Sequence, residues 1–521
     1  MGSVGTSEVV VRYLFGLMCA LALGVMPMVG CSETSGDGGS GGSAGTGATG
    51  GSGGSGGAGG TGGAGGTGGI ILCDEDWECL DPNDCITWSC EDGMCVYGNE
   101  PREKICDLGD GVHHGLCDGA GTCLECHEDA HCDDFNDCTS GSCSDGVCNH
   151  TSLADGTPCA GGTCEVGRCV LSSKVLPCTE QGIRNAVAAG GGPYTFDCDG
   201  RATVFIKAEI VIERNVILDG EGDLTVDGSK AEFVPGGAEF PGPVFRVRSL
   251  PGGSVTSELR GFAVTNGREG IVASPRFPGG DTLTLVDSTV SGNSGSGIGN
   301  FGSTLIVVNT TVSGNSGNGI RNGGTLMLIN STVSGNSAGE EGWPWGGGIS
   351  GWGEMTLVNS TVSGNSAVDG GGIAIACDID LGATLTLVHS TVSGNVASGE
   401  GSAISNSNCG MTLTVTNSLI DGDCSGDITS GGDNIESPGD TCGFEQGTDL
   451  VNITEGQLDL GPLQDNDGPT MTHALGADSV AIDHIPAVDC EVDEDQRGEP
   501  RPETDGDACD VGAFERQPED P

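Results

Sequence analysis

One glycine-rich stretch, AGEEGWPWGGGISGW at residues 338–352, combines side chains that suit recognition of sugars. Its aromatic faces can stack on sugar rings, and its carboxylates can accept hydrogen bonds from sugar hydroxyls. The candidate glycan-binding residues are Trp343, Trp345, Trp352, Glu340 and Glu341. The alternative is that the tryptophans fold over the chain and cover its apolar surface. The stretch therefore predicts either a glycan site or a local cover.

Catalytic groups are harder to find. A polysaccharide lyase needs a carboxylate-held calcium and an Arg or Lys base, whereas a glycoside hydrolase needs two carboxyl groups about 5 to 9.5 Å apart. The repetitive region, residues 281–418, offers almost no such residues on its strand-like segments. The densest carboxylate group lies in DGEGDLTVDG, residues 219–228, a text typical of a turn between strands. No catalytic residue is assigned, and enzyme activity stays an alternative.

A second group with chemical potential is the cysteine-rich part between Cys73 and Cys169, which holds 16 cysteines. Five of them have intervals of 5, 5, 4 and 4 residues between them from Cys73 to Cys95, and the same intervals return from Cys126 to Cys148. This repetition indicates a tandem duplication of a small module. An even number of cysteines at repeated intervals favours disulfides in an oxidising compartment, although pairing does not follow from sequence.

Two metals compete with that interpretation. Zinc could be bound by sulfur and imidazole ligands that lie close together, namely Cys123, Cys126, His113, His114, His127 and His131. Calcium could be held by the acidic cluster Asp133, Asp134 and Asp137, which lacks the spacing of an EF-hand loop. Paired intervals after export favour disulfides over zinc, and a solvated acidic face over calcium. The prediction is no cofactor, with calcium as the one open option.

The elements that must position these groups are set by a repeated phrase, STVSGNS, between residues 281 and 418. Its asparagines, Asn293, Asn315, Asn336, Asn365 and Asn395, are separated by 22, 21, 29 and 30 residues. Apolar residues alternate with threonines before each copy, which is a strand pattern. One isoleucine follows each copy after a glycine-rich turn. A fixed period of this length indicates a repeat architecture.

Stacking of these units predicts a parallel β-helix of about ten coils. Equivalent residues of successive coils would lie about 4.8 Å apart. One inward ladder would be Leu283, Leu305, Leu326, Met355, Leu385 and Leu413, and a second would be Ile298, Ile320, Ile349, Ile373 and Ile404. The asparagines would stack at a bend through their side-chain amides. The longer spacings are expected to be insertions at turns, because strands cannot lengthen without losing register.

A single amphipathic helix is expected before the coils, in CTEQGIRNAVAA, residues 178–189. Thr179 can cap its N-terminus, and Ile183 and Val187 lie on one face. Such a helix would cover the open end of the apolar core. Cys178 and Cys198 flank the helix and are expected to form a disulfide.

The N-terminal residues predict that the protein is exported. Arg12 precedes an apolar run that ends in Met-Val-Gly-Cys, and this resembles a bacterial lipoprotein signal peptide cut before Cys31, the lipidated residue. Met28 departs from the usual Leu; an ordinary secretory signal or an uncleaved anchor is the alternative. Ser32 after the cysteine favours the outer membrane in such lipoproteins. The next residues, to 69, are almost wholly Gly, Ser, Ala and Thr, a composition typical of a disordered, flexible tether.

Composition agrees with an exported solenoid. The formal net charge is −55, which argues against nucleic-acid binding, because a phosphate backbone needs a basic surface. With 98 glycines and only 4% aromatic residues, the narrow aliphatic core of a solenoid fits better than a large globular core.

Two family resemblances sharpen these expectations. The phrase NHTSLADGTPC resembles myxobacterial-type Cys-rich repeats, found in large secreted proteins of predatory soil bacteria. Residues 176–516 resemble choice-of-anchor Q bacterial surface proteins, most specifically at the phrases LGPLQDNDGPTMTHAL, EDQRGEPRP and CDVGAFE. That resemblance implies an all-β, right-handed parallel β-helix, but no common activity. Cys490 and Cys509 bracket the DQRG phrase and are expected to form a disulfide.

The predicted organisation has six parts: a signal peptide (1–30), a tether (31–69), a disulfide module (70–170), an N-terminal cap (171–200), the β-helix (201–450) and a choice-of-anchor Q-like segment (451–521). The expected function is a non-catalytic lipoprotein at the outer membrane or cell surface, or secreted, whose β-helix binds or adheres to partners such as polysaccharides. The alternatives are a pectin-lyase-like polysaccharide lyase or glycoside hydrolase, and a passive envelope protein without a ligand.

Overall fold

The computed structural model describes residues 83–91, 94–102, 104–107, 114–231, 242–275, 280–339, 345–375, 383–406, 412–503, 508–518 and 520. The chain divides into two compact units, one of Met1–Cys79 with Cys90–Cys95 and one of Leu80–Ser89 with Val96–Pro521. The second unit contains the β-helix.

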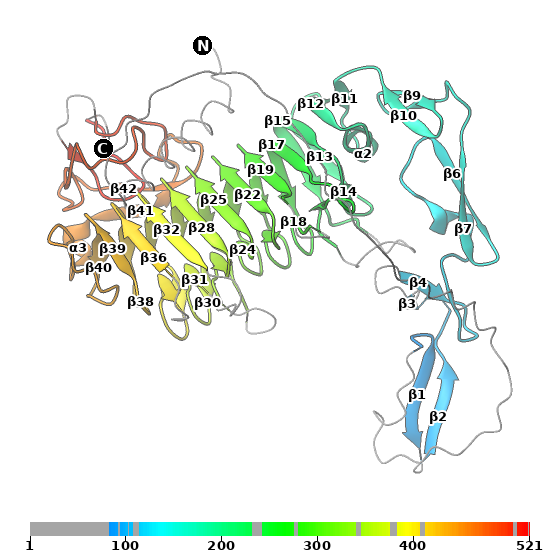
Figure 1. Ribbon diagram of the computed structural model, residues 1–521, viewed down its shortest axis with the longest axis horizontal. Coiled ribbons are helices and arrows are strands. Elements are labelled where there is room, and N and C mark those ends of the chain that lie inside the picture. The colour runs from blue at the N-terminus through cyan, green and yellow to red at the C-terminus, as the bar shows by residue number, and fades with distance from the viewer. Residues whose placement is uncertain are drawn as a thin grey trace, which may run out of the picture. The chain divides into compact units, whose positions relative to one another are not determined.

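The β-helix consists of coils with three strands each, and equivalent strands of successive coils stack into three columns (Figure 1). The first column contains β11 (Val175–Pro177), β12 (Gly191–Asp197), β19 (Thr282–Val286), β22 (Thr304–Val308), β25 (Thr325–Ile329), β28 (Glu354–Val358), β32 (Thr384–Val388), β36 (Thr412–Thr416) and β39 (Thr429–Gly432). The second contains β13 (Ala202–Phe205), β20 (Thr289–Ser291), β23 (Thr311–Ser313), β26 (Thr332–Ser334), β29 (Thr361–Ser363), β33 (Thr391–Ser393), β37 (Leu419–Asp421) and β40 (Ile435–Ser437). Two long strands, β15 (Val216–Asp227) and β17 (Thr256–Thr265), run through both columns.

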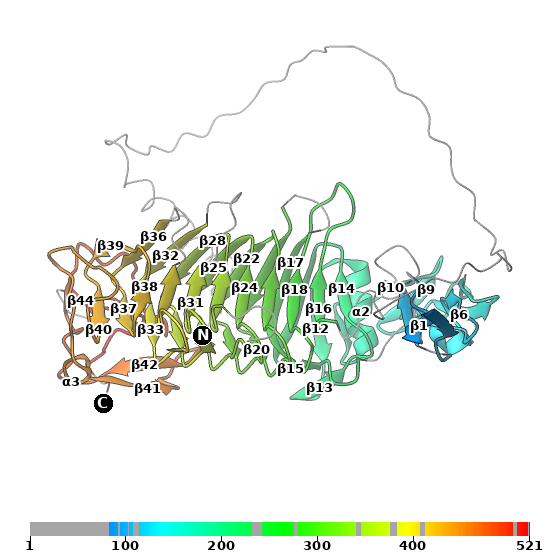
Figure 2. The same cartoon turned by 90° about the horizontal axis from the view of Figure 1, so that it is seen from below.

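The third column is a separate sheet of nine parallel strands, seen side by side in Figure 2. They are β14 (Ile210–Ile212), β16 (Phe245–Val247), β18 (Ile271–Ala273), β21 (Ile298–Asn300), β24 (Ile320–Asn322), β27 (Ile349–Gly351), β31 (Ile373–Ile375), β35 (Ile404–Asn406) and β38 (Cys424–Ser425). A short extra pair, β30 (Ser366–Ala367) and β34 (Val396–Ala397), lies between the second and third columns along the chain.

The core contains the predicted ladders. Leu283 to Leu413 pair coil by coil in the first column, and Ile298 to Ile404 pair in the third. All these side chains are buried. Because burial of one such side chain contributes roughly 1.5–3 kcal/mol, the repetition of short aliphatic strands stabilises the regular coils. Aromatic side chains such as Phe245 and Phe262 fill the core of the first coils. Both predicted ladders are confirmed.

The asparagine ladder is confirmed as well. The side-chain amide of each asparagine donates to the side-chain oxygen of the next, over 2.9 Å from Asn293 to Asn315, 2.8 Å from Asn315 to Asn336, 2.9 Å from Asn336 to Asn365 and 3.0 Å from Asn365 to Asn395. Each side-chain oxygen also accepts the backbone N–H of the preceding asparagine, for example Asn315 N to Asn336 Oδ1 over 3.1 Å. The ladder satisfies buried polar groups at the bend, and its regularity is structural.

The corner between the first and second columns explains another repeated position. Each strand of the first column in the regular repeats is followed by a residue with a left-handed backbone, at φ values of 48° for Asp287, 49° for Asn309, 49° for Asn330, 46° for Asn359, 45° for His389 and 53° for Asn417. Asn, Asp and His are the non-glycine residues that most often adopt this conformation. The corner therefore selects these residue types for backbone reasons.

The capping helix is α2 (Glu180–Ala189), and Thr179 caps it by accepting the backbone N–H of Gly182 over 3.1 Å. Ile183 and Val187 are buried against the first coil. The outer side of the helix contacts the cysteine-rich module, because Gln181 Nε2 donates to the Phe135 carbonyl over 2.9 Å. The helix is therefore covered on both sides.

The cysteine-rich module consists of short antiparallel strands held by disulfides. Its elements are β1 (Ile86–Glu91), β2 (Met94–Asn99), β3 (Ile105–Asp107), β4 (His114–Cys117), β5 (Cys123–Leu124), the 3-10 helix η2 (Asp129–Cys132), β6 (Thr139–Ser144), β7 (Val147–Ser152), β8 (Pro158–Cys159), β9 (Gly162–Glu165) and β10 (Arg168–Leu171). Its described disulfides are Cys85–Cys117, Cys106–Cys123, Cys126–Cys143, Cys132–Cys148, Cys138–Cys164 and Cys159–Cys169. Further along the chain a disulfide joins Cys424 and Cys442.

The C-terminal segment, residues 451–518, folds back along the coils. It contains α3 (Glu455–Leu458), β41 (Leu460–Gln464), β42 (Thr472–Leu475), β43 (Ile485–Pro486) and β44 (Ala508–Cys509). The hairpin β41–β42 lies on the side of the second column, away from the third (Figure 2). A second apolar core, which includes Leu458, Ile485 and Phe514, packs this segment against Leu419 and Ile435 of the last coils.

Candidate functional site

The predicted glycan-binding residues are only partly within the described structure. Trp343, Glu340 and Glu341 lie outside the described residues. Trp345 lies four residues before the start of β27, and its side chain is 39% exposed. Its backbone is held from both neighbouring coils: Asn318 Nδ2 donates to its carbonyl over 2.6 Å, and Trp345 forms a parallel bridge with Asp369. The partly exposed indole is therefore attached to a backbone that both neighbouring coils hold.

Trp352 lies at the other end of β27 and has different neighbours. Its ring lies 6.4 Å from the ring of Phe301, centroid to centroid, with the planes tilted by 36°. A Cβ atom at Gly323 would come within 2.5 Å of the Trp352 ring, so the glycine is needed for the ring to lie against the chain. Trp345 and Trp352 thus flank one strand, and Trp352 acts partly as the cover that the sequence left open as an alternative.

Arg321, at the centre of β24, lies over the rings of Phe301 and Trp352. Its guanidinium carbon lies 5.2 Å from the Phe301 ring centroid and 5.3 Å from that of Trp352, within the range of cation–π attraction. Burial lowers the pKa of Arg321 from its ordinary value, and the charge of Glu269 opposes that shift. In register with Arg321 on the next strand is Ser350. Its hydroxyl is buried and has no hydrogen-bond partner among the described residues.

Sequence reasoning missed Arg321, Phe301 and Ser350. A signal for the first was present: Arg321 is the only Lys or Arg between residues 277 and 496. Phe301 and Ser350 carried no such signal, because their proximity to Arg321 depends on the stacking of coils 20 to 30 residues apart.

The densest set of ionisable groups lies elsewhere, under the C-terminal segment. Arg501 donates to the Asp510 and Gly512 carbonyls over 2.9 and 3.0 Å and hydrogen-bonds to Nδ1 of His389 at a coil corner. Glu515 Oε2 lies 3.6 Å from Arg501 Nε and accepts the backbone N–H of Asp510 over 2.9 Å. The side chains of Arg501 and Glu515 are both 0% exposed.

Burial dominates the electrostatics of this network. It raises the pKa of Glu515 to about 8 and that of Asp510 to about 6, against the attraction of Arg501. Burial, helped by the charge of Arg501, holds the pKa of His389 well below its ordinary value. At neutral pH, Asp510 therefore balances the charge of Arg501, Glu515 keeps its proton, and neutral His389 accepts from Arg501. The phrases PRP and CDVGAFE thus form the buried attachment of the segment to the coils.

The same segment covers the polar face of the second column. Thr332 Oγ1 donates to the Met471 carbonyl over 2.6 Å, and Thr361 Oγ1 donates to Gln496 Oε1 over 2.6 Å. The backbone N–H of Ala513 donates to Thr391 Oγ1 over 3.0 Å. These three threonines are buried. The phrase DQRG, which contains Gln496, therefore serves to dock the segment.

One pair in this interface has the composition of a nucleophile and its base. Ser363 Oγ lies 2.8 Å from His473 Nε2, and His473 Nδ1 lies 2.7 Å from the Gly461 carbonyl. Burial lowers the pKa of His473, although the Gly461 carbonyl and Asp421 oppose the shift. Ser363 is 4% and His473 is 7% exposed, so a substrate could reach them only after the C-terminal segment had moved. We interpret the pair as another docking contact.

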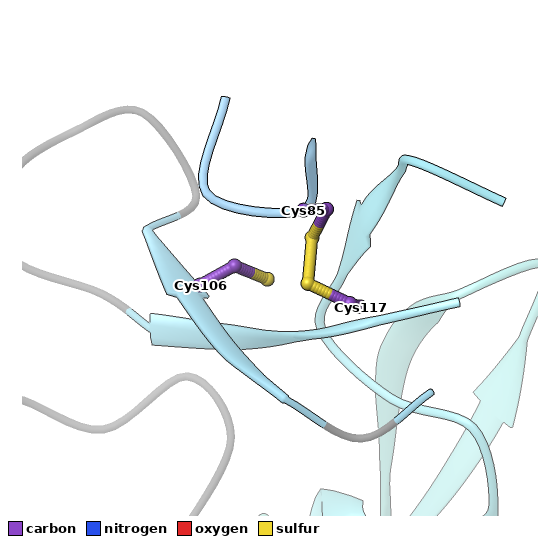
Figure 3. Close-up of side chains that lie close together, drawn as sticks. All are labelled: Cys85, Cys106 and Cys117. Atoms are coloured by element: carbon purple, nitrogen blue, oxygen red, sulfur yellow. A yellow bond between two sulfur atoms is a disulfide. The ribbon is translucent and has the colours of Figure 1, made fainter. Parts of the chain in front are cut away.

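The remaining predicted groups are mostly cysteines, and the described ones are bonded in pairs. Cys178 and Cys198 form a disulfide, as do Cys490 and Cys509. The cysteines considered for zinc are bonded in the pairs Cys106–Cys123 and Cys126–Cys143. Three cysteine clusters have metal-like proximity; Figure 3 shows one, in which Cys85 is bonded to Cys117 with Cys106 beside them. Disulfides account for that proximity. Cys31 lies outside the described residues.

Comparison with known proteins supports the architecture. Residues 270–441 match the family described as the right-handed β-helix region. Together with the stacked parallel strands, this match confirms the predicted right-handed parallel β-helix. Among solved structures, the crystal structure of pectate lyase Pel9A matches with a TM-score of 0.38 and 13% identity, covering 64% of this chain and 90% of that chain. At these values it carries no argument about activity. No curated protein matches the chain.

Proposed function

We propose that this protein is a non-catalytic surface protein whose β-helix binds glycans. The observation that carries the proposal is the position of Trp345, which is 39% exposed at a corner held by hydrogen bonds from its neighbouring coils. With the backbone held in this way, only the two side-chain torsions of the tryptophan are fixed when a sugar ring stacks on it, so little conformational freedom is lost. Trp352 lies seven positions further on, so the Cα atoms of the two tryptophans are at most about 25 Å apart, a span that suits an extended chain of sugars.

The burial of the ionisable groups under the C-terminal segment supports binding over catalysis by those groups. Arg501, Glu515 and His389 are enclosed in the attachment of the C-terminal segment, and Ser363 and His473 lie beneath it. An exposed pair of carboxylates at hydrolase spacing would favour the enzyme alternative. The structure gives more support to a rigid scaffold with aromatic contacts.

The test is binding of the mature protein to a glycan array, followed by affinity measurement on the glycans that bind. Trp345→Ala should weaken binding about tenfold, since one stacking contact is worth about 1.4 kcal/mol or less. Phe205→Ala is the matched control, because Phe205 is also aromatic and 50% exposed but belongs to β13 at the start of the coils. Equal effects of both substitutions, or an unchanged affinity of Trp345→Ala, would contradict the proposal.

The enzyme alternative is tested separately, by measuring whether the protein cleaves polysaccharides. Incubation of the same preparation with pectins, other uronans and neutral polysaccharides, with calcium present, would release reducing or unsaturated ends if the protein were a hydrolase or lyase. We expect no release. Sustained turnover that is abolished by a substitution in the β-helix would replace the binding proposal with an enzymatic one.

We further propose that the protein is lipidated at Cys31 and reaches the outer membrane, with residues 32–69 as a tether. The support is the lipoprotein-like text before Cys31 and the glycine-rich composition after it. No helix among the described residues is long and apolar enough to cross a bilayer. Cys31→Ser should shift the protein from the membrane fraction to the soluble fraction in cell fractionation. Retention of the variant in the membrane would refute lipid anchoring at this residue.

A further inference from the structure

Arg321 and Ser350 lie side by side on the outer side of the third column. They occupy the central positions of β24 and β27 and are paired in register. Their strand neighbours Ile320 and Ile349 point into the core, so Arg321 and Ser350 point outward. Adjacent strands are about 4.8 Å apart, and one oxygen-bearing group can therefore contact both a guanidinium and a hydroxyl placed in this way.

The hydroxyl of Ser350 gives an independent sign of a ligand. Ser350 is 0% exposed, and its Oγ has no hydrogen-bond partner among the described residues. A buried hydroxyl without a partner costs free energy, and such a group calls for an explanation in a native structure. An oxygen of a bound molecule beside Arg321 would supply the missing partner after a shift of the side chains that cover Ser350.

Two aromatic rings, those of Phe301 and Trp352, lie beside Arg321 because each packs against a glycine. Phe301 folds against Gly299, where a Cβ atom would come within 2.8 Å of its ring, and Trp352 folds against Gly323 in the same way. Arg321 stands over both rings, at 5.2 and 5.3 Å from their centroids. Sugar rings stack on aromatic faces, whereas a guanidinium binds a carboxylate through two parallel hydrogen bonds. The combination therefore suits a sugar that carries an acidic group.

We infer that Arg321, Ser350, Phe301 and Trp352 form a subsite for a carboxylate-bearing sugar within an otherwise neutral glycan chain. A single acidic group per binding position fits this choice, since Arg321 is the only Lys or Arg in the sequence between residues 277 and 496. The chain as a whole has a formal charge of −55, so it repels a dense polyanion. Electrostatic repulsion is screened beyond about 8 Å at physiological salt. A glycan whose single carboxylates are separated by neutral sugars is therefore repelled much less than a dense polyanion.

This inference rests on the proposed glycan-binding function and names its ligand class. The test compares binding of the mature protein to three polysaccharides: glucuronoxylan, whose neutral backbone carries isolated uronic acids, neutral arabinoxylan, and polygalacturonate, a dense polyanion. We expect glucuronoxylan to bind about tenfold or more tightly than either of the others, as one charge-assisted bidentate contact supplies that much.

Substitutions assign the preference to the subsite. Arg321→Gln should remove the preference for glucuronoxylan, and Ser350→Ala should reduce it by several fold while leaving the melting temperature unchanged or higher, because the orphaned hydroxyl is gone. Arg268→Gln is the matched control, since Arg268 is exposed at a corner of the coils. It should leave the preference intact. If Arg321→Gln fails to fold, the Ser350→Ala result decides the test.

The possible results distinguish failure of the acidic-sugar subsite from failure of the proposed glycan-binding function. Equal binding of glucuronoxylan and arabinoxylan, stronger binding of polygalacturonate, or equal effects of Arg321→Gln and Arg268→Gln would overturn this subsite and leave glycan binding standing. A preference for glucuronoxylan that survives in folded Arg321→Gln and in Ser350→Ala would overturn it as well. Absence of binding to all three polysaccharides and to the array would overturn the proposed function, and the subsite with it.

Discussion

Replacing Glu515 with glutamine should remove a large part of the pH dependence with which the C-terminal segment stays attached to the β-helix. Burial raises the pKa of Glu515 from its ordinary 4.5 to about 8. A carboxyl group with a raised pKa holds its proton more tightly in the folded state. Its contribution to stability is therefore complete below pH 4.5 and is lost as the pH rises through 8.

The magnitude follows from the two pKa values. Between pH 5 and pH 9, a shift of the pKa from 4.5 to about 8 removes about 4 kcal/mol from the free energy of opening, most of it below pH 8. The histidines act in the opposite direction at the acid end, because burial lowers the pKa values of His389 and His473. The comparison between the natural protein and Glu515→Gln cancels these common contributions. Glutamine also loses one acceptor oxygen, a constant cost of about 1 kcal/mol.

The assay is hydrogen exchange of residues 508–518 at pH 5, 7 and 9, which gives the free energy of local opening after correction for the intrinsic rate. The difference between the natural protein and Glu515→Gln should fall by about 4 kcal/mol across this range. Glu494→Gln is the control, because Glu494 belongs to the same segment but is exposed. A difference that stays constant, or that grows with pH, would show that Glu515 is ionised in the folded protein and that the burial argument is wrong.

Two further predictions concern what holds the coils and the segment together. Gln496→Ala should leave the buried Thr361 hydroxyl without its acceptor and remove the hydrogen bonds that Gln496 Nε2 donates to Thr332 and Thr470, whose hydroxyls keep the Met471 and Asn330 carbonyls as acceptors. The loss should weaken attachment of the C-terminal segment by about 2–4 kcal/mol and expose it to limited proteolysis while the coils stay resistant; unchanged proteolysis would argue against docking through the DQRG phrase. Asn336→Leu interrupts the asparagine ladder between Asn315 and Asn365 and should lower the free energy of unfolding of the β-helix by about 2–4 kcal/mol, measured in urea. The control Ser316→Ala, beside the ladder, should lower it by less than about 1 kcal/mol. Similar losses for both variants would refute a special role of the ladder.

The sequence could predict the repeated coils because each of them obeys a local rule. Alternation of Leu and Thr identifies strands, the recurring asparagine marks the bend, and the common period implies stacking in register. The ladders from Leu283 and from Asn293 follow from these rules alone. The capping helix α2 is predictable for the same reason, since Thr179 and the spacing of Ile183 and Val187 are local signals.

The candidate site is predictable only in part. Trp345 stood out because tryptophan is rare in this chain, and its exposure at a corner agrees with a binding role. The position of Trp352 against Phe301 was not predictable, because the two residues belong to different coils and meet across Gly323. Sequence proximity suggested one group of tryptophans, whereas the strand β27 divides them between two corners.

By itself the sequence determined what depends on neighbours along the chain: the strands, the period, the helix, the duplicated cysteine intervals and the overall charge. Only the tertiary structure decided which distant residues meet. It placed His389 of a coil corner against Arg501 of the C-terminal segment, and Ser350 beside Arg321. The physical reason is that burial and pairing are properties of the assembled coils. The DQRG and CDVGAFE phrases, which resemble a family signature, prove to consist of docking contacts, because their polar side chains are satisfied only by the surface on which they lie.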